Sequence, residues 1–351
     1  MKYLLLLILI LPASVLGQRN ILNAKSPDEI GQKTIDELII GEDEGPLAYA
    51  YVNERDVLFS MTVWESIDLD ERVNFPLYFP ADTTVVRVER RPLIHYLITN
   101  VIVAEIPLNI YTSSTLMIEK PIDNLKKDLI YREIKEDIEG IGLERIKSEG
   151  PTPKLFLLNN NMDLGEYANY DETDKEKTAE EIAEFNFAME SLIFENNLLE
   201  EDEYYLEEFN YGDVVSYKIK GVWYFDKRQA ELKYRPIAIC PVIETPKSKK
   251  VREQKPETPP ELIDLFWMFY PDTREVLFEA EAFNEANTSK PVNFDHLINS
   301  RRFSAYIYKE DNVFQDRSLK EYIPENALMQ LLESERIKEK IRNKEQDMWS
   351  Y

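Results

Sequence analysis

The chain has 351 residues, of which 44% are hydrophobic and 31% are charged, so it has ample apolar side chains for a folded core. Its formal net charge is −24 at pH 7. A charge of this sign repels nucleic acids and anionic lipid surfaces, and it argues against direct binding to either. The single cysteine, Cys240, excludes an intramolecular disulfide.

The first residues predict a cleaved signal peptide. Lys2 is followed by an apolar run from Leu4 to Leu11, and the small residue Gly17 marks the expected cleavage site. The run is shorter than the roughly 20 residues that span a membrane. No cysteine stands at the cleavage site, so we expect a soluble envelope protein without a lipid anchor of its own. We assign residues 1–17 to the signal and 18–50 to a flexible N-terminal segment.

Residues 51–244 are expected to form an α+β domain. Its first part, "DVLFSMTVWESIDLDERVNFPLYFP", is rich in aromatic side chains. The stretch "RPLIHYLITNVI" predicts a buried helix, because apolar residues recur three and four apart after Pro92. Similar spacing between Pro121 and Gly140 predicts a second helix over residues 121–140.

An acidic insertion over residues 163–213 interrupts this domain. It contains eighteen acidic and two basic residues, a local net charge of −16. Within it, "AEEIAEFNFAMESLIF" places Ile182, Phe185, Met189 and Ile193 on one side of a predicted helix. We therefore expect a solvated, partly helical insertion.

The sequence after the insertion predicts two strands that form a hairpin. Ile219, Trp223 and Phe225 alternate with lysines, and the return strand continues to Cys240. Pro236 predicts a bulge or an edge position, because proline cannot donate a hydrogen bond to a ladder.

Residues 245–261, "TPKSKKVREQKPETPPE", are almost entirely polar, and we expect a linker or long loop. The C-terminal part, residues 262–351, begins with an aromatic strand that ends at Tyr270 and continues as a strand or a short helix. From Pro324 onward we expect the longest helix, with an inward apolar set that comprises Leu328, Leu331, Leu332, Ile337 and Ile341. The predicted fold class is α+β, with aromatic-rich antiparallel hairpins, packed helices and a long C-terminal helix.

The chain has no recognisable catalytic motif. The two histidines, His95 and His296, lie far apart in sequence and lack a metal-binding spacing. Cys240 lies in an apolar strand, where a buried inert thiol is the usual interpretation. Carboxylate pairs beside aromatic side chains could hydrolyse or bind carbohydrate, although 66 acidic residues guarantee such pairs by abundance. This leaves an envelope carbohydrate-binding or glycoside-hydrolysing protein as an alternative.

Several long segments resemble one known family. The blocks "VWESIDLDERVNFPLYFP", "GVWYFDKRQAELKYRPIAICP", "DLFWMFYPDTREVLFEAEAFN", "FDHLINSRRFSAYIYKEDNVFQDR" and "ALMQLLESERIKEKIRNKEQDMW" occur in this order and resemble the GldN or PorN family of the Bacteroidota. The resemblance covers roughly residues 56–349, apart from the acidic insertion and the predicted linker.

The resemblance implies a non-enzymatic role without a cofactor in the type IX secretion system and gliding motility. Proteins similar to this one form a periplasmic ring with an outer-membrane lipoprotein, GldK or PorK, and contact the periplasmic region of the motor protein, GldM or PorM. We expect aromatic and arginine side chains to anchor such contacts. The predicted interaction residues are Trp64, Arg72, Tyr78, Trp223, Tyr224, Phe225, Arg228, Trp267, Phe269 and Tyr270.

Overall fold

The structure is a computed structural model that describes residues 45–82, 91–104, 108–134, 152–162, 204–283, 292–313, 316–324 and 326–349, and some positions between 164 and 199. The predicted signal peptide lies outside these residues. The chain divides into two compact units: unit 1 comprises Met1–Lys126 and Phe209–Tyr351, and unit 2 comprises Lys127–Glu208. The predicted α+β class is confirmed.

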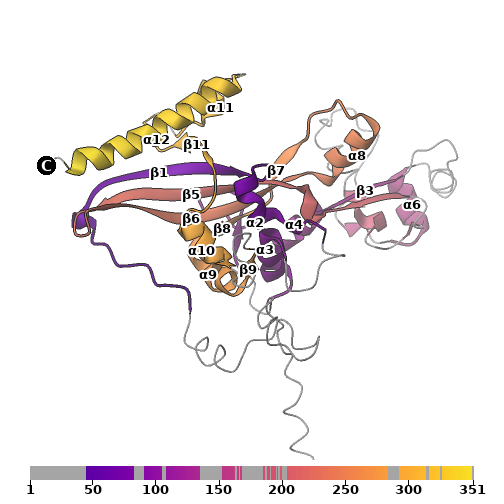
Figure 1. Cartoon of the computed structure of the whole chain (residues 1–351). Coiled ribbons are helices and arrows are strands. Elements are labelled where there is room, and N and C mark those ends of the chain that lie inside the picture. The colour runs from indigo at the N-terminus through magenta and orange to yellow at the C-terminus, as the bar shows by residue number, and fades with distance from the viewer. Residues whose placement is uncertain are drawn as a thin grey trace, which may run out of the picture. The chain divides into compact units, whose positions relative to one another are not determined.

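A mixed-length antiparallel sheet forms the centre of unit 1 (Figure 1). Its strand order is β11-β1-β5-β6-β8-β2, and β7 also pairs with β6. The strands are β1 (Val57–Asp68), β2 (Ile110–Tyr111), β5 (Val214–Asp226), β6 (Glu231–Glu244), β7 (Leu262–Asp264), β8 (Trp267–Phe269) and β11 (Tyr306–Glu310). A small second sheet pairs β9 (Glu281–Ala282) with β10 (Val292–Asn293).

The predicted hairpin is confirmed as β5 and β6. Trp223 pairs with Tyr234 and Phe225 with Leu232 near the turn. The register shifts where Gly221 faces Pro236, so the predicted bulge is also present. Among the described residues, β8 pairs with β6 only at Ala238 and Ile239 and β7 only at Val242–Glu244, so Pro236 also lies in a stretch of β6 that pairs on one side alone, where a missing donor is tolerated.

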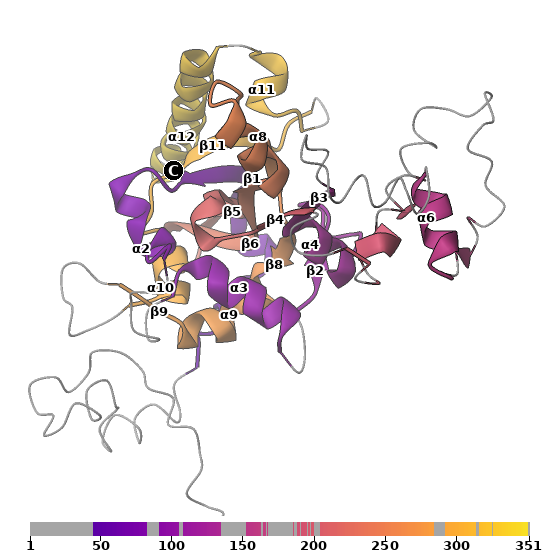
Figure 2. The same cartoon turned by 90° about the vertical axis from the view of Figure 1, so that its right-hand side faces the viewer.

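Helices pack against the edge strand β11 and against the inner strand β6 of the sheet in unit 1. Figures 1 and 2 place α12 beside β11 and place α9 and α10 beside β6. The helices are α2 (Phe75–Tyr78), α3 (Leu93–Ile102), α4 (Ile122–Asp128), α8 (Pro246–Gln254), α9 (Tyr270–Glu279), α10 (Phe294–Asn299), α11 (Leu319–Tyr322) and α12 (Ala327–Trp349). Short 3-10 turns cover Glu54–Asp56, Arg72–Asn74 and Tyr211–Asp213.

The predicted helix after Pro92 is confirmed as α3, which buries Leu93, Ile94, Leu97 and Val101. The prediction of one helix over residues 121–140 is wrong. The helix α4 ends at Asp128, and Ile130–Ile134 form strand β3. The sequence of β3 is rich in β-branched and aromatic residues, and pairing with a strand about 70 positions later overrides the helical spacing.

The C-terminal helix exists as predicted, but three of the five residues in its expected inward set are exposed. Ile337 and Ile341 are buried with Met61, Val63 and Ile307 on one face of the sheet. The three leucines Leu328, Leu331 and Leu332 are instead 68%, 52% and 56% exposed. The apolar residues of α12 therefore form two stripes, and only the stripe near the middle of the helix faces the sheet.

The helix α12 also caps the free edge of the sheet. The Ser334 hydroxyl, which is buried, accepts a hydrogen bond of 2.8 Å from the backbone N–H of Ile307 in edge strand β11. A covered edge cannot pair with strands of other molecules. Burial of Ile337 and Ile341 therefore also protects the sheet.

Residues 246–254 of the predicted linker or long loop form a capped helix, α8, whereas residues 255–261 form neither helix nor strand. The Thr245 hydroxyl accepts from the Ser248 N–H, and Pro246 occupies the first turn of α8. The Thr245 N–H donates to the Glu261 carbonyl, so both ends of the segment meet. Strand β6, before this segment, and strands β7 and β8, after it, belong to one sheet, so the segment does not separate two compact units. The second compact unit is instead Lys127–Glu208.

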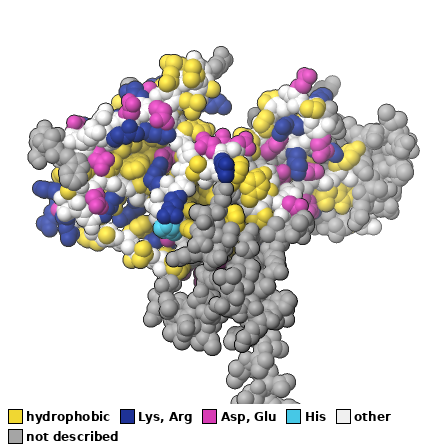
Figure 3. Space-filling model, viewed as in Figure 1, with side chains coloured by type: hydrophobic (Ala, Val, Ile, Leu, Met, Phe, Trp, Pro, Cys, Tyr) yellow, Lys and Arg dark blue, Asp and Glu magenta, His cyan; other side chains and the backbone are white. Residues whose placement is uncertain are grey.

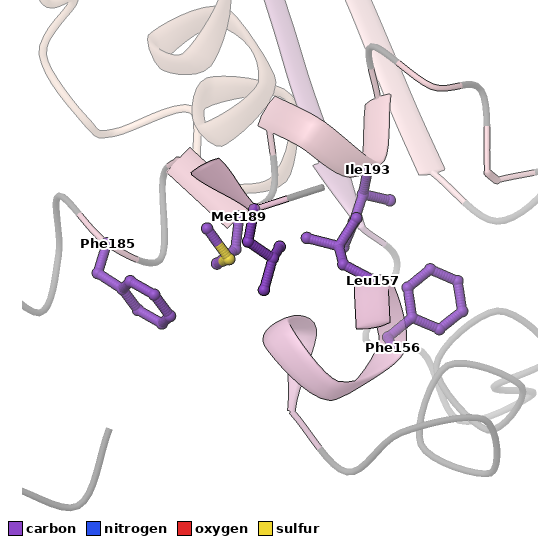
Figure 4. Packing of buried hydrophobic residues seen from close by; sticks show 6 residues of the cluster. Phe156, Leu157, Phe185, Met189 and Ile193 are labelled. Carbon is purple, nitrogen blue, oxygen red and sulfur yellow. The ribbon is translucent and has the colours of Figure 1, made fainter. Parts of the chain in front are cut away.

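Unit 2 has its own core. Strand β3 pairs with β4 (Tyr204–Glu208), and α6 (Pro153–Asn159) begins at a Thr152 cap. Its buried cluster comprises Phe156, Leu157, Leu164, Phe185, Met189 and Ile193 (Figure 4). Three of the four residues predicted to pack together in the acidic insertion are thus buried together, whereas Ile182 lies outside the described residues.

In the part of the chain that the structure describes, no helix has the length and apolar character needed to cross a membrane.

Candidate interaction surface

A buried ion pair links β1 to the end of α10. The Glu65 carboxylate is 1% exposed and accepts two hydrogen bonds from Arg301, Nη1 to Oε2 at 2.6 Å and Nη2 to Oε1 at 2.9 Å. Arg301 adopts a φ of 52°, in the left-handed region that few residues other than glycine occupy. The two-pronged bond holds the guanidinium in a fixed plane.

Three aromatic rings surround this guanidinium. Its central carbon lies 4.9 Å from the Trp223 ring centre, 4.2 Å from Tyr234 and 5.1 Å from Phe303. Burial lowers the pKa of Arg301, but hydrogen bonding and the charge of Glu65 outweigh burial and raise it overall. We name these four residues, Trp223, Tyr234, Arg301 and Phe303, the arginine–aromatic patch.

The patch is partly accessible to a partner. The Arg301 side chain is 24% exposed, and all three rings are half-buried. Figure 3 shows apolar side chains with Lys and Arg side chains around them on the face of the molecule drawn there. Aromatic rings and a fixed arginine lose little conformational entropy on binding, and such residues dominate binding hot spots.

Gly221 makes the close packing of Tyr234 possible. A Cβ atom at position 221 would stand 2.2 Å from the Tyr234 hydroxyl oxygen and 2.3 Å from Cζ. Burial, followed by the nearby Glu65 carboxylate, raises the pKa of Tyr234 well above its usual value. The ring therefore stays neutral beneath the guanidinium.

A second arginine cluster fastens the segment before β1. The Asp295 carboxylate accepts from Arg274, and from the Tyr270 hydroxyl at 2.9 Å. Arg274 also donates to the Leu47 carbonyl at 2.7 Å, and its guanidinium lies 4.2 Å from the Tyr49 ring centre. Burial raises the pKa of Tyr49 to about 12.

The predicted interaction residues fall into three groups. Trp64, Phe225, Trp267 and Tyr270 are buried and serve the core. Arg72 and Arg228 are exposed, and Tyr78, Trp223, Tyr224 and Phe269 are half-buried. Of these ten, only Trp223 joins the arginine–aromatic patch.

The sequence analysis did not single out Arg301, Tyr234 or Phe303 as interaction residues. Tyr234 lies directly across from Trp223, so the alternation of the hairpin was an available signal. The pairing of Arg301 with Glu65 joins positions 236 residues apart, and no local pattern encodes it.

The residues considered for catalysis lie in structural settings. His95 Nδ1 is 2.8 Å from the Tyr211 hydroxyl, and burial lowers the pKa of His95. The Cys240 thiol is buried, which raises its pKa and disfavours the reactive thiolate. Within the described ranges, no group of three or more His, Cys, Asp or Glu side chains could hold a metal ion.

Comparison with protein families identifies a matching family. The profile described as "Gliding motility associated protein GldN" matches residues 52–350, which is nearly the whole chain. The search of curated proteins gave no match. The matched range includes both compact units and the arginine–aromatic patch. The chain therefore belongs to the GldN family, whose members are structural components of the gliding motility and type IX secretion machinery.

Proposed function

We propose that this protein is a non-enzymatic periplasmic component of the type IX secretion system and that it forms a ring with an outer-membrane lipoprotein of the GldK or PorK type. Family membership supports this role. In this proposal the signal peptide directs export, and the lipoprotein holds the protein at the outer membrane. The periplasmic region of GldM or PorM is the proposed second partner.

The arginine–aromatic patch is the observation that carries the proposal. It places an oriented guanidinium and three aromatic rings on one partly open surface. A catalytic site would need an acid, a base or a nucleophile within reach of a substrate. A preformed arginine with flat apolar neighbours instead suits a protein partner, because it offers both a charged contact and apolar area.

Co-expression with the lipoprotein lacking its lipid tests the role. Residues 18–351 would be purified with that partner, and their mass and shape measured by light scattering and electron microscopy. A ring that contains both chains is the expected result. A monomer that does not bind the lipoprotein would contradict the proposed ring. The carbohydrate-binding or glycoside-hydrolysing alternative would then be tested with glycan arrays and hydrolase screens.

A pair of phenylalanine variants tests the patch itself. Phe303→Ala removes a half-buried ring beside Arg301 and should weaken lipoprotein binding at least tenfold, as expected for a hot-spot residue. Phe283→Ala is the matched control, since Phe283 is 39% exposed and lies outside the patch. Equal binding by the two variants would exclude the patch as the lipoprotein contact.

A further inference from the structure

The other face of the sheet in unit 1 carries a group of lysines. Lys220 on β5 and Lys309 on β11 both pair with Trp64 on β1, so the three side chains form one row across the strands. Lys218 lies two residues along β5 on the same face. We name Lys218, Lys220 and Lys309 the lysine face.

We propose that the lysine face binds the acidic stretch, residues 163–213, of a second copy of this chain. The inference rests on the self-association that the proposed ring requires, and it assigns the two surfaces that meet. Copies joined through two different surfaces form a head-to-tail contact, which generates closed rings when the rotation closes.

The first support is the geometry of the row. The Lys220 and Lys309 ammonium groups lie 5.2 Å and 4.4 Å from the Trp64 ring centre. The Trp64 ring thus lies beside two like charges, on the two strands that flank β1. Repulsion between them is part of the reason that the pKa of Lys220 is lowered, after burial, which is the larger cause.

The second support is that two of the three lysines lack a direct carboxylate partner. Lys218 forms an ion pair of 2.6 Å with Asp264. Asp311 and Asp316, on the turn after β11, interact with Lys220 and Lys309 only through their charges. Within the described part of the chain, neither Lys220 nor Lys309 has a carboxylate at ion-pair distance.

The third support is the neutral partner of Lys220. Lys220 donates to the Ser114 carbonyl at 3.1 Å, and a carbonyl does not neutralise the charge of the ammonium group. Carboxylates are therefore the chemistry that complements the row.

Charge complementarity within the chain identifies the occupant. The acidic stretch has a net charge of −16 and includes "DETD" from Asp171 and "EEDE" from Glu200. Most of the excess negative charge of the protein lies in this stretch. A neighbouring copy in a ring supplies it at a high local concentration.

A charge-swap experiment tests the proposal. The double variant Lys220→Glu/Lys309→Glu should weaken association between copies at least about fivefold. Lys227→Glu/Lys255→Glu makes the same change in net charge at two exposed positions and is the matched control. A further variant reverses charges in the acidic stretch by four substitutions: Asp171→Lys, Glu172→Lys, Glu200→Lys and Glu201→Lys. We call it the reversed-stretch variant.

Sedimentation velocity of the chain, alone and with the lipoprotein, would compare the variants at about 50 mM and about 500 mM NaCl. We expect the lysine-face variant and the reversed-stretch variant each to associate poorly alone. An equal mixture of these two variants should associate again.

Association between copies that is equal at both salt concentrations would overturn the inference. An equal loss of association in the control variant Lys227→Glu/Lys255→Glu would overturn it as well. A chain that carries both the lysine-face substitutions and the four substitutions in the acidic stretch should associate again, because both surfaces are then reversed. If this chain is as monomeric as the lysine-face variant alone, the inference is also overturned.

The two proposals fail in different ways. Loss of lipoprotein binding by the parent chain would contradict the proposed function. Normal lipoprotein binding with a contact between copies that is insensitive to charge would contradict only the assignment of the lysine face.

Discussion

Replacement of Gly221 by alanine should destabilise unit 1 through a single side chain. The added Cβ would lie 2.2 Å, 2.3 Å and 2.5 Å from the Oη, Cζ and Cε2 atoms of Tyr234. All three distances are far inside van der Waals contact, and Tyr234 is itself held between Trp223 and Arg301. The ring must therefore move, and overpacking of this kind costs about 1–3 kcal/mol of unfolding free energy.

Urea unfolding followed by circular dichroism would measure the cost, with Gly212→Ala as the control. A Cβ atom at Gly212 would meet its nearest neighbours at 3.7 Å and 3.8 Å, so that variant should change stability by less than about 0.5 kcal/mol. Tyr234→Leu removes the clashing atoms, and Gly221→Ala should cost clearly less in that background. An equal cost in both backgrounds would refute the steric explanation.

Three further predictions concern buried polar groups. Ser334→Ala should lower the unfolding free energy by about 1–3 kcal/mol, because it leaves the Ile307 N–H buried without its acceptor; urea unfolding would detect this. Asp295→Asn should cost about 3 kcal/mol by the same assay, since it leaves the buried charge of Arg274 without its partner, and an unchanged midpoint would contradict the ion-pair argument. Burial raises the pKa of the Cys240 thiol, so a thiol reagent at pH 8 should label it only after unfolding, and rapid labelling of the folded chain would contradict its burial.

Local patterns predicted the elements whose contacts are close in sequence. The helix at Leu93–Ile102 and the hairpin at β5 and β6 follow from apolar spacing, a favourable proline and strand alternation. The strand Ile130–Ile134 was mistaken for helix because its partner, Tyr204–Glu208, is distant and its pairing leaves no mark in the local period.

The arginine–aromatic patch, the candidate interaction surface, was predictable only in part. Trp223 was identified from its aromatic neighbourhood, but Glu65 and Arg301 meet through the tertiary fold and from distant positions. The exposed leucines of α12 show a related limit. Helical spacing reveals that a stripe is apolar, but which stripe is buried depends on the surface that the helix meets, here β11 and β1 around Ile337.

The antiparallel pairing of β3 with β4 brings the two ends of unit 2 together. Ile130 pairs with Glu208, so the chain leaves unit 1 and returns to it along adjacent strands. In evolutionary terms, unit 2 is a cassette: it could lengthen, gain charge or be exchanged while the strand order of the main sheet is kept.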